Sequence, residues 1–148
     1  MNVLSVMRLL SPLIGDVNYE LVFLPNIVGE GLRIKPSMIP NAGLGLYTTR
    51  PRINNEKLDN YNEGTIRESK AQIDQRYGDN LAQYVWCSSD RNCRDAKSTQ
   101  SNWSRYANAC LQNNQCTGII KNNGNLRTLR PLQAGEEILI NYGPEYML

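Results

Sequence analysis

The residues most able to take part in chemistry lie in three stretches rich in glycine, tyrosine and amide side chains. The glycine stretch, residues 40–47, reads PNAGLGLY, and the arginine stretch, residues 102–108, reads NWSRYAN. The C-terminal stretch, residues 135–146, reads GEEILINYGPEY. Glycines let a ligand approach the backbone closely, and neutral tyrosine hydroxyls can orient a bound group. These residue types favour a reaction that depends on positioning.

The absence of histidine narrows the possible reactions. The sequence has 0 His, which excludes Ser–His and Cys–His nucleophile pairs and mixed Cys/His zinc sites. Cofactor chemistry, or a reaction that needs orientation more than a protein nucleophile, is therefore favoured.

The cysteines do not have the spacing of a metal site. Cys87, Cys93, Cys110 and Cys116 form no C-x-x-C pair, so we predict no metal. Two disulfides are formally possible. With no secretory signal in the sequence, reduced thiols are expected instead, and Cys110 and Cys116 are expected to be small buried side chains.

Each candidate residue also has a structural explanation. The glycine stretch could be a strand with glycines at a bulge, and Tyr142 could simply end a strand. Arg105 could form a buried ion pair with Glu136 or Glu137, and Asn108 could cap a loop. Only the combination of the stretches distinguishes the two interpretations.

Composition indicates one globular domain. The chain has 148 residues, 41% of them hydrophobic, and a net charge of +2, which suits a single core. No basic block indicates direct nucleic-acid binding, and no apolar run is long enough to cross a membrane. Residues 1–15 lack the basic start of a signal peptide, so residues 1–31 are expected to form an extension packed on the main body.

The elements that would position these residues are mostly short strands. Residues 32–35 alternate as a strand does, residues 44–49 continue the glycine stretch as a strand, and residues 82–87 form another. Residues 116–120 and 125–129 are predicted to pair as a hairpin over an Asn-Gly turn. Residues 88–101 are polar and are predicted to be a loop.

The best helix candidate is residues 66–77. Thr65 could cap it, with Glu68 completing a capping box, and Gly78 could end it. One helix among many strands predicts a mainly β domain.

Together, in this order and spacing, the three stretches resemble the motifs of SET-domain protein lysine methyltransferases. The glycine stretch is like the family's G-x-G cofactor loop, and the C-terminal stretch is like its G-E-E-[LI]-x-x-x-Y-G motif. The arginine stretch resembles the N-W-x-R-Y-x-N form of the PR/SET branch. Tyr61 resembles the tyrosine of the family's Y-x-G turn, with one extra residue before Gly64. The resemblance covers residues 32–146 of a single domain, 1–148.

The resemblance implies a β-clip of small sheets with a C-terminal pseudoknot and one or two short helices. It also implies S-adenosylmethionine as the methyl donor and a lysine that enters through a channel from the opposite face. Tyr142 and Tyr61 would be catalytic. The implied cofactor-binding residues are Gly43, Leu44, Gly45, Leu46, Arg105, Tyr106, Asn108, Ala109, Tyr142 and Tyr146.

Some family features are missing. Ala109 replaces the motif histidine, and no aromatic residue occurs between Ala107 and Asn141 to supply the usual channel aromatic. A degenerate SET fold that binds a peptide or protein without turnover is therefore the alternative. The chain resembles the minimal, stand-alone SET domains of viruses and bacteria that act on a eukaryotic host's chromatin. A histone-tail substrate, an intracellular and nuclear location, and a homodimer that completes the substrate groove are the corresponding expectations.

Overall fold

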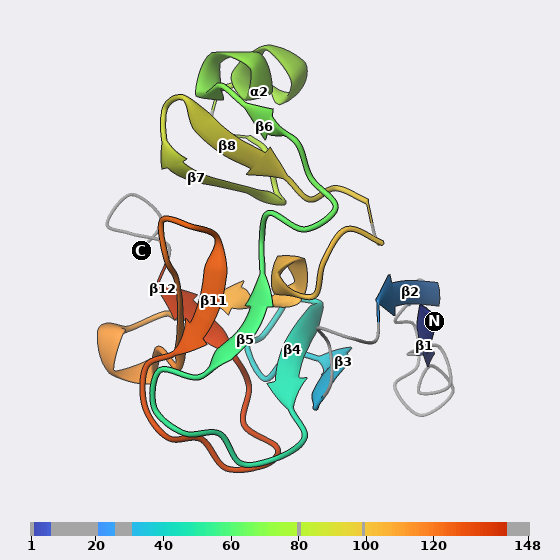
Figure 1. Cartoon of the computed structure of the whole chain (residues 1–148), viewed down its shortest axis with the longest axis vertical. Helices are drawn as coiled ribbons and strands as arrows, with labels where there is room; N and C mark the ends of the chain where they lie inside the picture. Colours follow the sequence, from blue (N-terminus) through green and yellow to red (C-terminus); the bar gives the residue numbers. More distant parts are fainter. Residues whose placement is uncertain (1, 7–20, 26–30, 80, 99, 142–148) are drawn as a thin grey trace.

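The structure is a set of small β-sheets, as predicted (Figure 1). It is a computed structural model, and it describes residues 2–6, 21–25, 31–79, 81–98 and 100–141. The largest sheet has the order β5-β11-β10-β12-β9. Its strands are β5 (Lys57–Asn60), β9 (Asn108–Ala109), β10 (Gly118–Ile120), β11 (Asn125–Thr128) and β12 (Leu139–Asn141).

Three smaller sheets surround it. Two of them are antiparallel pairs, β1 (Asn2–Val6) with β2 (Leu21–Pro25), and β3 (Leu32–Pro36) with β4 (Leu44–Thr48). The third has the order β6-β8-β7, with strands β6 (Arg67–Glu68), β7 (Val85–Ser89) and β8 (Asn92–Asp95). Pairing of β1 with β2 shows extended structure near the N-terminus, while the division into extension and core stays a prediction.

The hydrophobic core joins the β3–β4 hairpin to the five-stranded sheet. Strand alternation places Ile34 and Leu46 on the inner face of the hairpin, and both are fully buried. Leu126, Ile138 and Ile140 are buried opposite them. The core thus holds the glycine stretch and the C-terminal stretch in one packed unit.

Strand β12 forms the pseudoknot that the resemblance implies. It lies between β9 and β10 and runs parallel to both. The connection from β9 to β10, residues 110–117, therefore crosses over β12.

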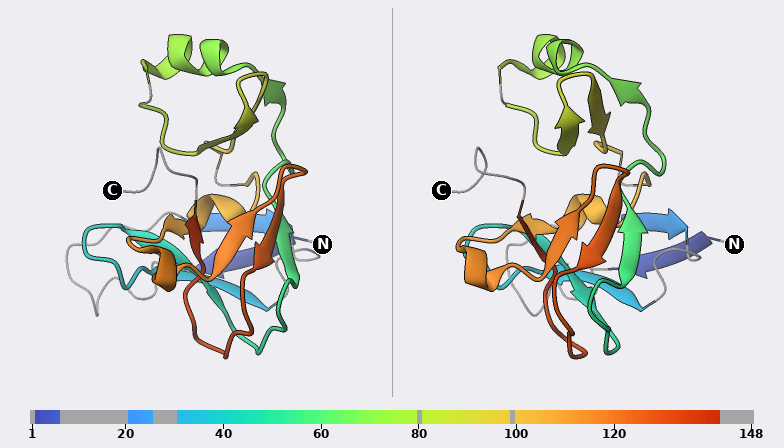
Figure 2. Two further views of the ribbon diagram at one scale, coloured as in Figure 1. Left: turned by 90° about the vertical axis from the view of Figure 1, so that its left-hand side faces the viewer. Right: turned by 60° about the vertical axis from the view of Figure 1, so that its left-hand side comes forward.

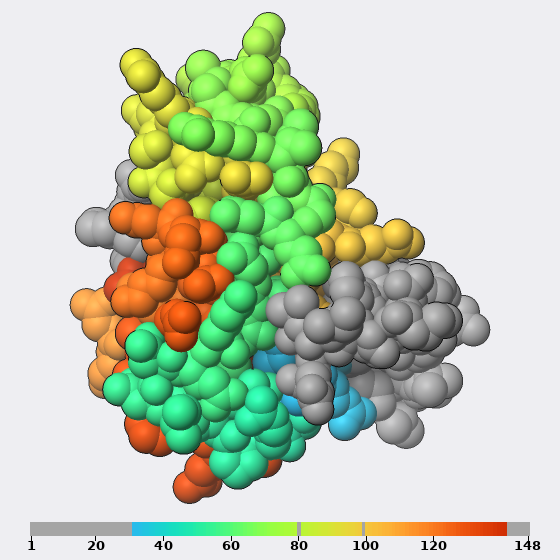
Figure 3. All heavy atoms as spheres, viewed as in Figure 1, coloured from blue at the N-terminus to red at the C-terminus, as the bar shows by residue number. Residues whose placement is uncertain are grey.

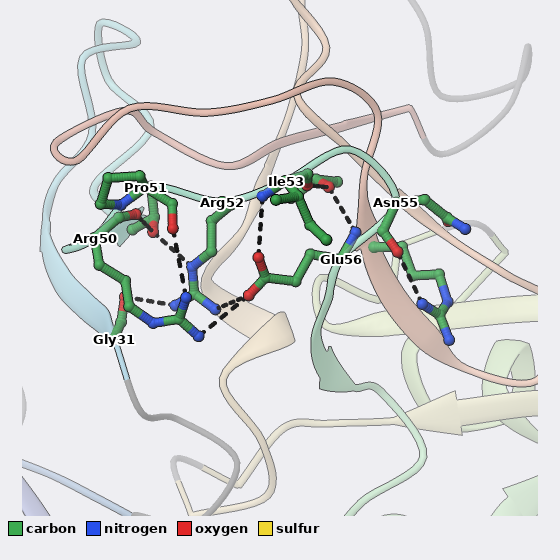
Figure 4. A network of polar contacts seen from close by, with 10 residues as sticks. Gly31, Arg50, Pro51, Arg52, Ile53, Asn55 and Glu56 are labelled. Carbon is green, nitrogen blue, oxygen red and sulfur yellow. Dashed lines mark hydrogen bonds and ion pairs between the residues drawn. The ribbon is translucent and has the colours of Figure 1, made fainter.

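A buried arginine fixes the far end of the β3–β4 hairpin (Figure 4). Arg52 donates from Nε to Thr48 Oγ1 at 2.9 Å, from Nη1 to Glu56 Oε2 at 2.9 Å and from Nη2 to the Gly31 carbonyl at 2.8 Å. Arg50 also pairs with Glu56, at 3.1 Å. This network ties the start of β3 to the end of β4.

A separate lobe stands on the core, as all three ribbon views and the space-filling view show (Figures 1, 2 and 3). We call residues 65–79 and 81–98 the insertion lobe; it contains the sheet β6-β8-β7 and helix α2 (Lys70–Tyr77). Short 3-10 helices, η2 (Ser104–Tyr106) and η3 (Asn113–Gln115), lie in the core part of the chain. No helix in the described ranges is long and apolar enough to span a bilayer.

The predicted start of the helix is wrong. Helix α2 begins after Ser69, which forms a capping box with Gln72, whereas Glu68 lies in β6 and pairs with Cys93 of β8. Tertiary strand pairing therefore displaced the local Thr65 cap. The predicted end at Gly78 is correct, because its N–H bonds to the Asp74 carbonyl at 2.7 Å.

The predicted loop 88–101 contains a strand that the sequence analysis missed. Residues 92–95 form β8, the central strand of the lobe's sheet, and Cys93 within it is completely buried. Only Cys93 of the four residues of β8 is apolar, so no apolar alternation marks the strand.

Reduced thiols were also a wrong prediction. Cys87 is bonded to Cys93 and Cys110 to Cys116, and the described residues include no free cysteine. Cys87 and Cys93 face each other across the β7–β8 hairpin, and Cys110 and Cys116 flank the β9–β10 connection. The prediction rested on cell compartment, which carries no information about these contacts. Cys110 and Cys116 are buried, as expected.

Candidate functional site

The two glycines of the glycine stretch serve different purposes. Gly43 has φ +72°, and a Cβ added there would meet nothing within 4 Å. At Gly45 a Cβ would lie 2.5 Å from Glu137 Oε2 and 3.2 Å from the Ser37 Cα. Gly43 therefore presents open backbone in a conformation that favours glycine, while Gly45 makes room for a carboxylate.

The carboxylate of Glu137 fastens the loop that precedes Gly43. It accepts hydrogen bonds from Ser37 Oγ at 2.6 Å, the Met38 N–H at 2.9 Å and Tyr47 Oη at 3.2 Å. Burial, together with this carboxylate, raises the pKa of Tyr47 well above its usual value, so the hydroxyl stays a donor. Glu137 thus links the C-terminal stretch to the glycine stretch.

Arg105 does not form the predicted alternative pair with Glu136 or Glu137. Its Nε donates to the Ala96 carbonyl at 2.7 Å and its Nη2 to the Lys97 carbonyl at 3.1 Å. The guanidinium lies 4.1 Å from the ring centroid of Tyr84 and 4.5 Å from that of Tyr106. Glu136 pairs instead with Arg130.

Asn108 connects all three stretches. Its Nδ2 donates to the Leu44 carbonyl at 2.9 Å, and its strand pairs with β12, with Asn108 opposite Leu139 and Ala109 opposite Ile140. The Leu46 side chain, in contrast, is in the core, and its carbonyl accepts from the Ile138 N–H at 2.7 Å.

A cavity of about 240 Å³ opens beside Arg105 and Asn108. Its walls come from both parts of the molecule: Ala82, Gln83, Tyr84 and Val85 from the insertion lobe, and Arg105, Ala107, Asn108 and Ala109 from the core. Three predicted cofactor-binding residues, Arg105, Asn108 and Ala109, therefore line one cavity. Tyr106 is buried and does not line the cavity; its ring packs against the Arg105 guanidinium.

A model of the SET domain matches residues 43–143 of the sequence. This chain belongs to the SET-domain family. Among solved structures it is similar to the methyltransferase domain of human PR domain-containing protein 2, with a TM-score of 0.55, 23% sequence identity, and coverage of 80% of this chain and 81% of that one. This likeness shows the fold. Members of the family are generally S-adenosylmethionine-dependent lysine methyltransferases that act on proteins.

Within the SET domain, Tyr61 pairs with an aromatic residue that sequence analysis did not consider. Its ring centroid lies 6.1 Å from that of Trp86, and the side chains are 2% and 7% exposed. The turn from Tyr61 to Gly64, which is one residue longer than the family's Y-x-G turn, is held by Asn102. Its Nδ2 donates to the carbonyls of Tyr61 at 2.9 Å and Glu63 at 3.0 Å. Trp86 lies in the insertion lobe, upstream of the segment between Ala107 and Asn141 from which the family's channel aromatic is missing.

Tyr84 is another residue that sequence analysis missed. It lines the cavity and covers the Arg105 guanidinium, but in the sequence it is one more aromatic at a strand start, so no local signal marks it. Tyr142 and Tyr146 lie outside the described residues. Strand β12 ends at Asn141, one residue before Tyr142.

One buried carboxyl lies close behind the arginine stretch. Asp59 is fully buried, and its Oδ2 accepts from the Ser104 N–H at 2.7 Å and Ser104 Oγ at 2.8 Å. Oδ1 has no hydrogen-bond partner among the described residues. Burial raises the pKa of Asp59 to about 6, although the Ser104 hydroxyl opposes the rise.

Proposed function

We propose that this SET domain is an S-adenosylmethionine-dependent protein lysine N-methyltransferase. The observation that carries the proposal is the cavity in which Arg105, Asn108 and Ala109 converge. Gly43 does not line this cavity, but it directly precedes Leu44, whose carbonyl is bonded to Asn108. Asn108 joins this cavity to the glycine loop through Leu44 and to β12 through strand pairing.

The chemistry of the cavity suits this cofactor. The Arg105 side chain is only 7% exposed, and no described carboxylate lies within ion-pair distance of it. A buried cation is stabilised by an anionic partner, and the cofactor's carboxylate supplies one. Its adenine and ribose would have Tyr84 and the backbone of Asn108 and Ala109 for stacking and hydrogen bonds.

When bound, the cofactor supplies a methyl group on a sulfonium for in-line transfer to an amine. The protein must then align a neutral lysine and exclude water. Free lysine has a pKa of about 10.4, and burial favours its neutral form. The Tyr61–Trp86 pair would form apolar walls for the lysine stem, and Tyr142 would orient the amine.

Substrate and assembly are further parts of the proposal. A lysine of a histone tail is the proposed substrate, and methylation of histones would place the protein in the nucleus. The proposed homodimer would complete the peptide groove. Sedimentation tests it directly, because a mass of 16.8 kDa at assay concentration would exclude a dimer.

Cofactor binding and turnover are the deciding measurements. Cofactor at ~100 times its dissociation constant should stabilise the fold by about 2.7 kcal/mol, which thermal unfolding detects. Labelled cofactor with a histone mixture, followed by mass spectrometry, then identifies the methylated lysine. No stabilisation at millimolar cofactor would contradict the proposal. Binding without methylation of histones or of a whole-cell protein mixture would favour the peptide-binding alternative.

A further inference from the structure

The Cys110–Cys116 disulfide sits where the pseudoknot closes. Cys110 follows β9 directly, Cys116 lies two residues before β10, and β12 passes between these strands. The two Cα atoms are 5.1 Å apart. The disulfide therefore ties together the ends of the two strands that hold β12.

The residues on both sides of this bond contact β12 directly. The Cys110 N–H donates to the Ile140 carbonyl at 3.0 Å, and the Thr117 N–H donates to the Leu139 carbonyl at 2.9 Å. Thr117 Oγ1 donates to the Glu137 carbonyl at 2.7 Å and accepts from the Leu139 N–H at 2.8 Å. Strand β12 is thus held from two sides by residues next to the disulfide.

These contacts connect the disulfide to the proposed cofactor site through both of its neighbouring strands. Asn108 and Ala109, which line the cavity, immediately precede Cys110. Glu137, which fixes the loop before Gly43, is bonded through its carbonyl to Thr117. Without the covalent link, β9 and β10 would be joined only through the exposed segment 111–115. This segment alone would not fix the distance between the two strands.

We propose that the Cys110–Cys116 disulfide is a positioning element of the cofactor site, so that cofactor binding depends on its oxidation state. The effect on cofactor binding rests on the proposed function. A dithiol reductant would break the sulfur–sulfur bond by exchange. The two cysteines would gain two electrons and two protons, and the dithiol would become its own disulfide.

The Cys87–Cys93 disulfide provides a matched control. It also links cysteines six residues apart, but it joins β7 to β8 within the insertion lobe and contributes no residue to the cavity. The full-length protein would be compared with the C110S/C116S and C87S/C93S variants, each with and without a dithiol. Alkylation and mass spectrometry would verify the state of each pair.

Reduction of the wild-type protein should weaken cofactor binding about tenfold or more in calorimetry. C110S/C116S should show the weak binding with or without dithiol, and C87S/C93S should keep the wild-type affinity and its sensitivity to dithiol. The proposal is overturned if the reduced wild-type protein binds within twofold of the oxidised form, or if sensitivity follows the Cys87–Cys93 pair.

Hydrogen exchange separates this inference from the proposed function, because it requires no cofactor. Reduction of the wild-type protein should speed exchange of the Leu139 and Thr117 amides, which bridge β12 and the disulfide segment. The Arg52 amide, bonded to the Leu132 carbonyl at 2.9 Å, should be unaffected. Unchanged exchange at Leu139 would refute the inference even if the protein binds no cofactor, and this measurement serves equally if a cysteine variant fails to fold.

Discussion

Asn108 is the residue at which the glycine loop, the arginine stretch and β12 meet. Replacing Asn108 by Ala removes the bond to the Leu44 carbonyl and leaves that acceptor without its partner. We expect cofactor affinity in calorimetry to fall by about 1–3 kcal/mol. Asn92→Ala is the control, because Asn92 is also half-buried and donates a bond of 2.7 Å to Ser88 Oγ in the insertion lobe. Equal losses in the two variants would assign Asn108 a structural role only.

Tyr142 tests mechanism rather than binding. Tyr142→Phe keeps the ring, so the fold and cofactor affinity should stay close to those of the wild type. Turnover should fall roughly ten- to thousand-fold, which corresponds to about 1.4–4 kcal/mol of barrier. Tyr77→Phe, which removes a hydroxyl bonded to Asp95 at 2.6 Å in the lobe, should leave turnover unchanged. If Tyr142→Phe kept full activity and formed the same product, the Tyr142 hydroxyl would have no role in the reaction.

Asp59 should make stability depend on pH. Its pKa is about 6 in the folded state against an ordinary value of 3.8, so folding favours the protonated form. The resulting stabilisation is fully present below a pH of about 4 and is lost as the pH rises through about 6, by about 3 kcal/mol in total. Urea unfolding of the wild type and of Asp59→Asn, measured from pH 3 to 7.5, should show the free-energy difference changing by about this amount. Parallel curves would show that Asp59 does not titrate in this range.

At the scale of elements, the glycine loop can be tested with two matched glycines. Gly43 and Gly135 both have positive φ and open space where a Cβ would lie, so Ala at either should cost about 1–2 kcal/mol of backbone strain. Only Gly43→Ala would place a methyl group where the cofactor is proposed to bind. Both variants should therefore melt at similar temperatures, and only Gly43→Ala should weaken cofactor binding. Equal cofactor affinity in the two variants would show that the cofactor does not bind against Gly43.

Elements with strong local signals were predictable from sequence. The β10–β11 hairpin follows from its Asn-Gly turn, and β3 from its alternation. Helix α2 and β8 were less predictable, because Glu68 could join either a capping box or a strand. The choice depended on β8, whose polar sequence gave no sign of its pairing.

The same distinction applies to the candidate site. Arg105, Asn108 and Ala109 were predicted through motifs, and the structure brings them to one cavity. Tyr84 and Trp86 were not predicted, because they come close to residues of the core only in the folded structure, where the insertion lobe packs on the core. The carboxylate behind Gly45 was missed for the same reason, since Glu137 lies 92 positions further along the chain.

For the molecule as a whole, Arg105 is one of the polar links between the insertion lobe and the core. It accounts for contacts to Ala96, Lys97 and Tyr84 of the lobe, and it lines the cavity that lies between the two parts. Occupation of that cavity would therefore add contacts on both sides of the boundary. Cofactor binding and the position of the lobe are expected to be coupled through this side chain.

The position of β12 also has a consequence for biosynthesis. A ribosome releases β9 and β10 before β12, so the place between these two strands stays empty until residues 139–141 emerge. Pairing across such sequence distances is slow compared with local hairpin formation. A nascent chain arrested after residue 131 should therefore be digested by protease about as fast as unfolded protein, while the released chain becomes resistant. Resistance of the arrested chain would show that the remaining strands form a stable fold before the last one is inserted.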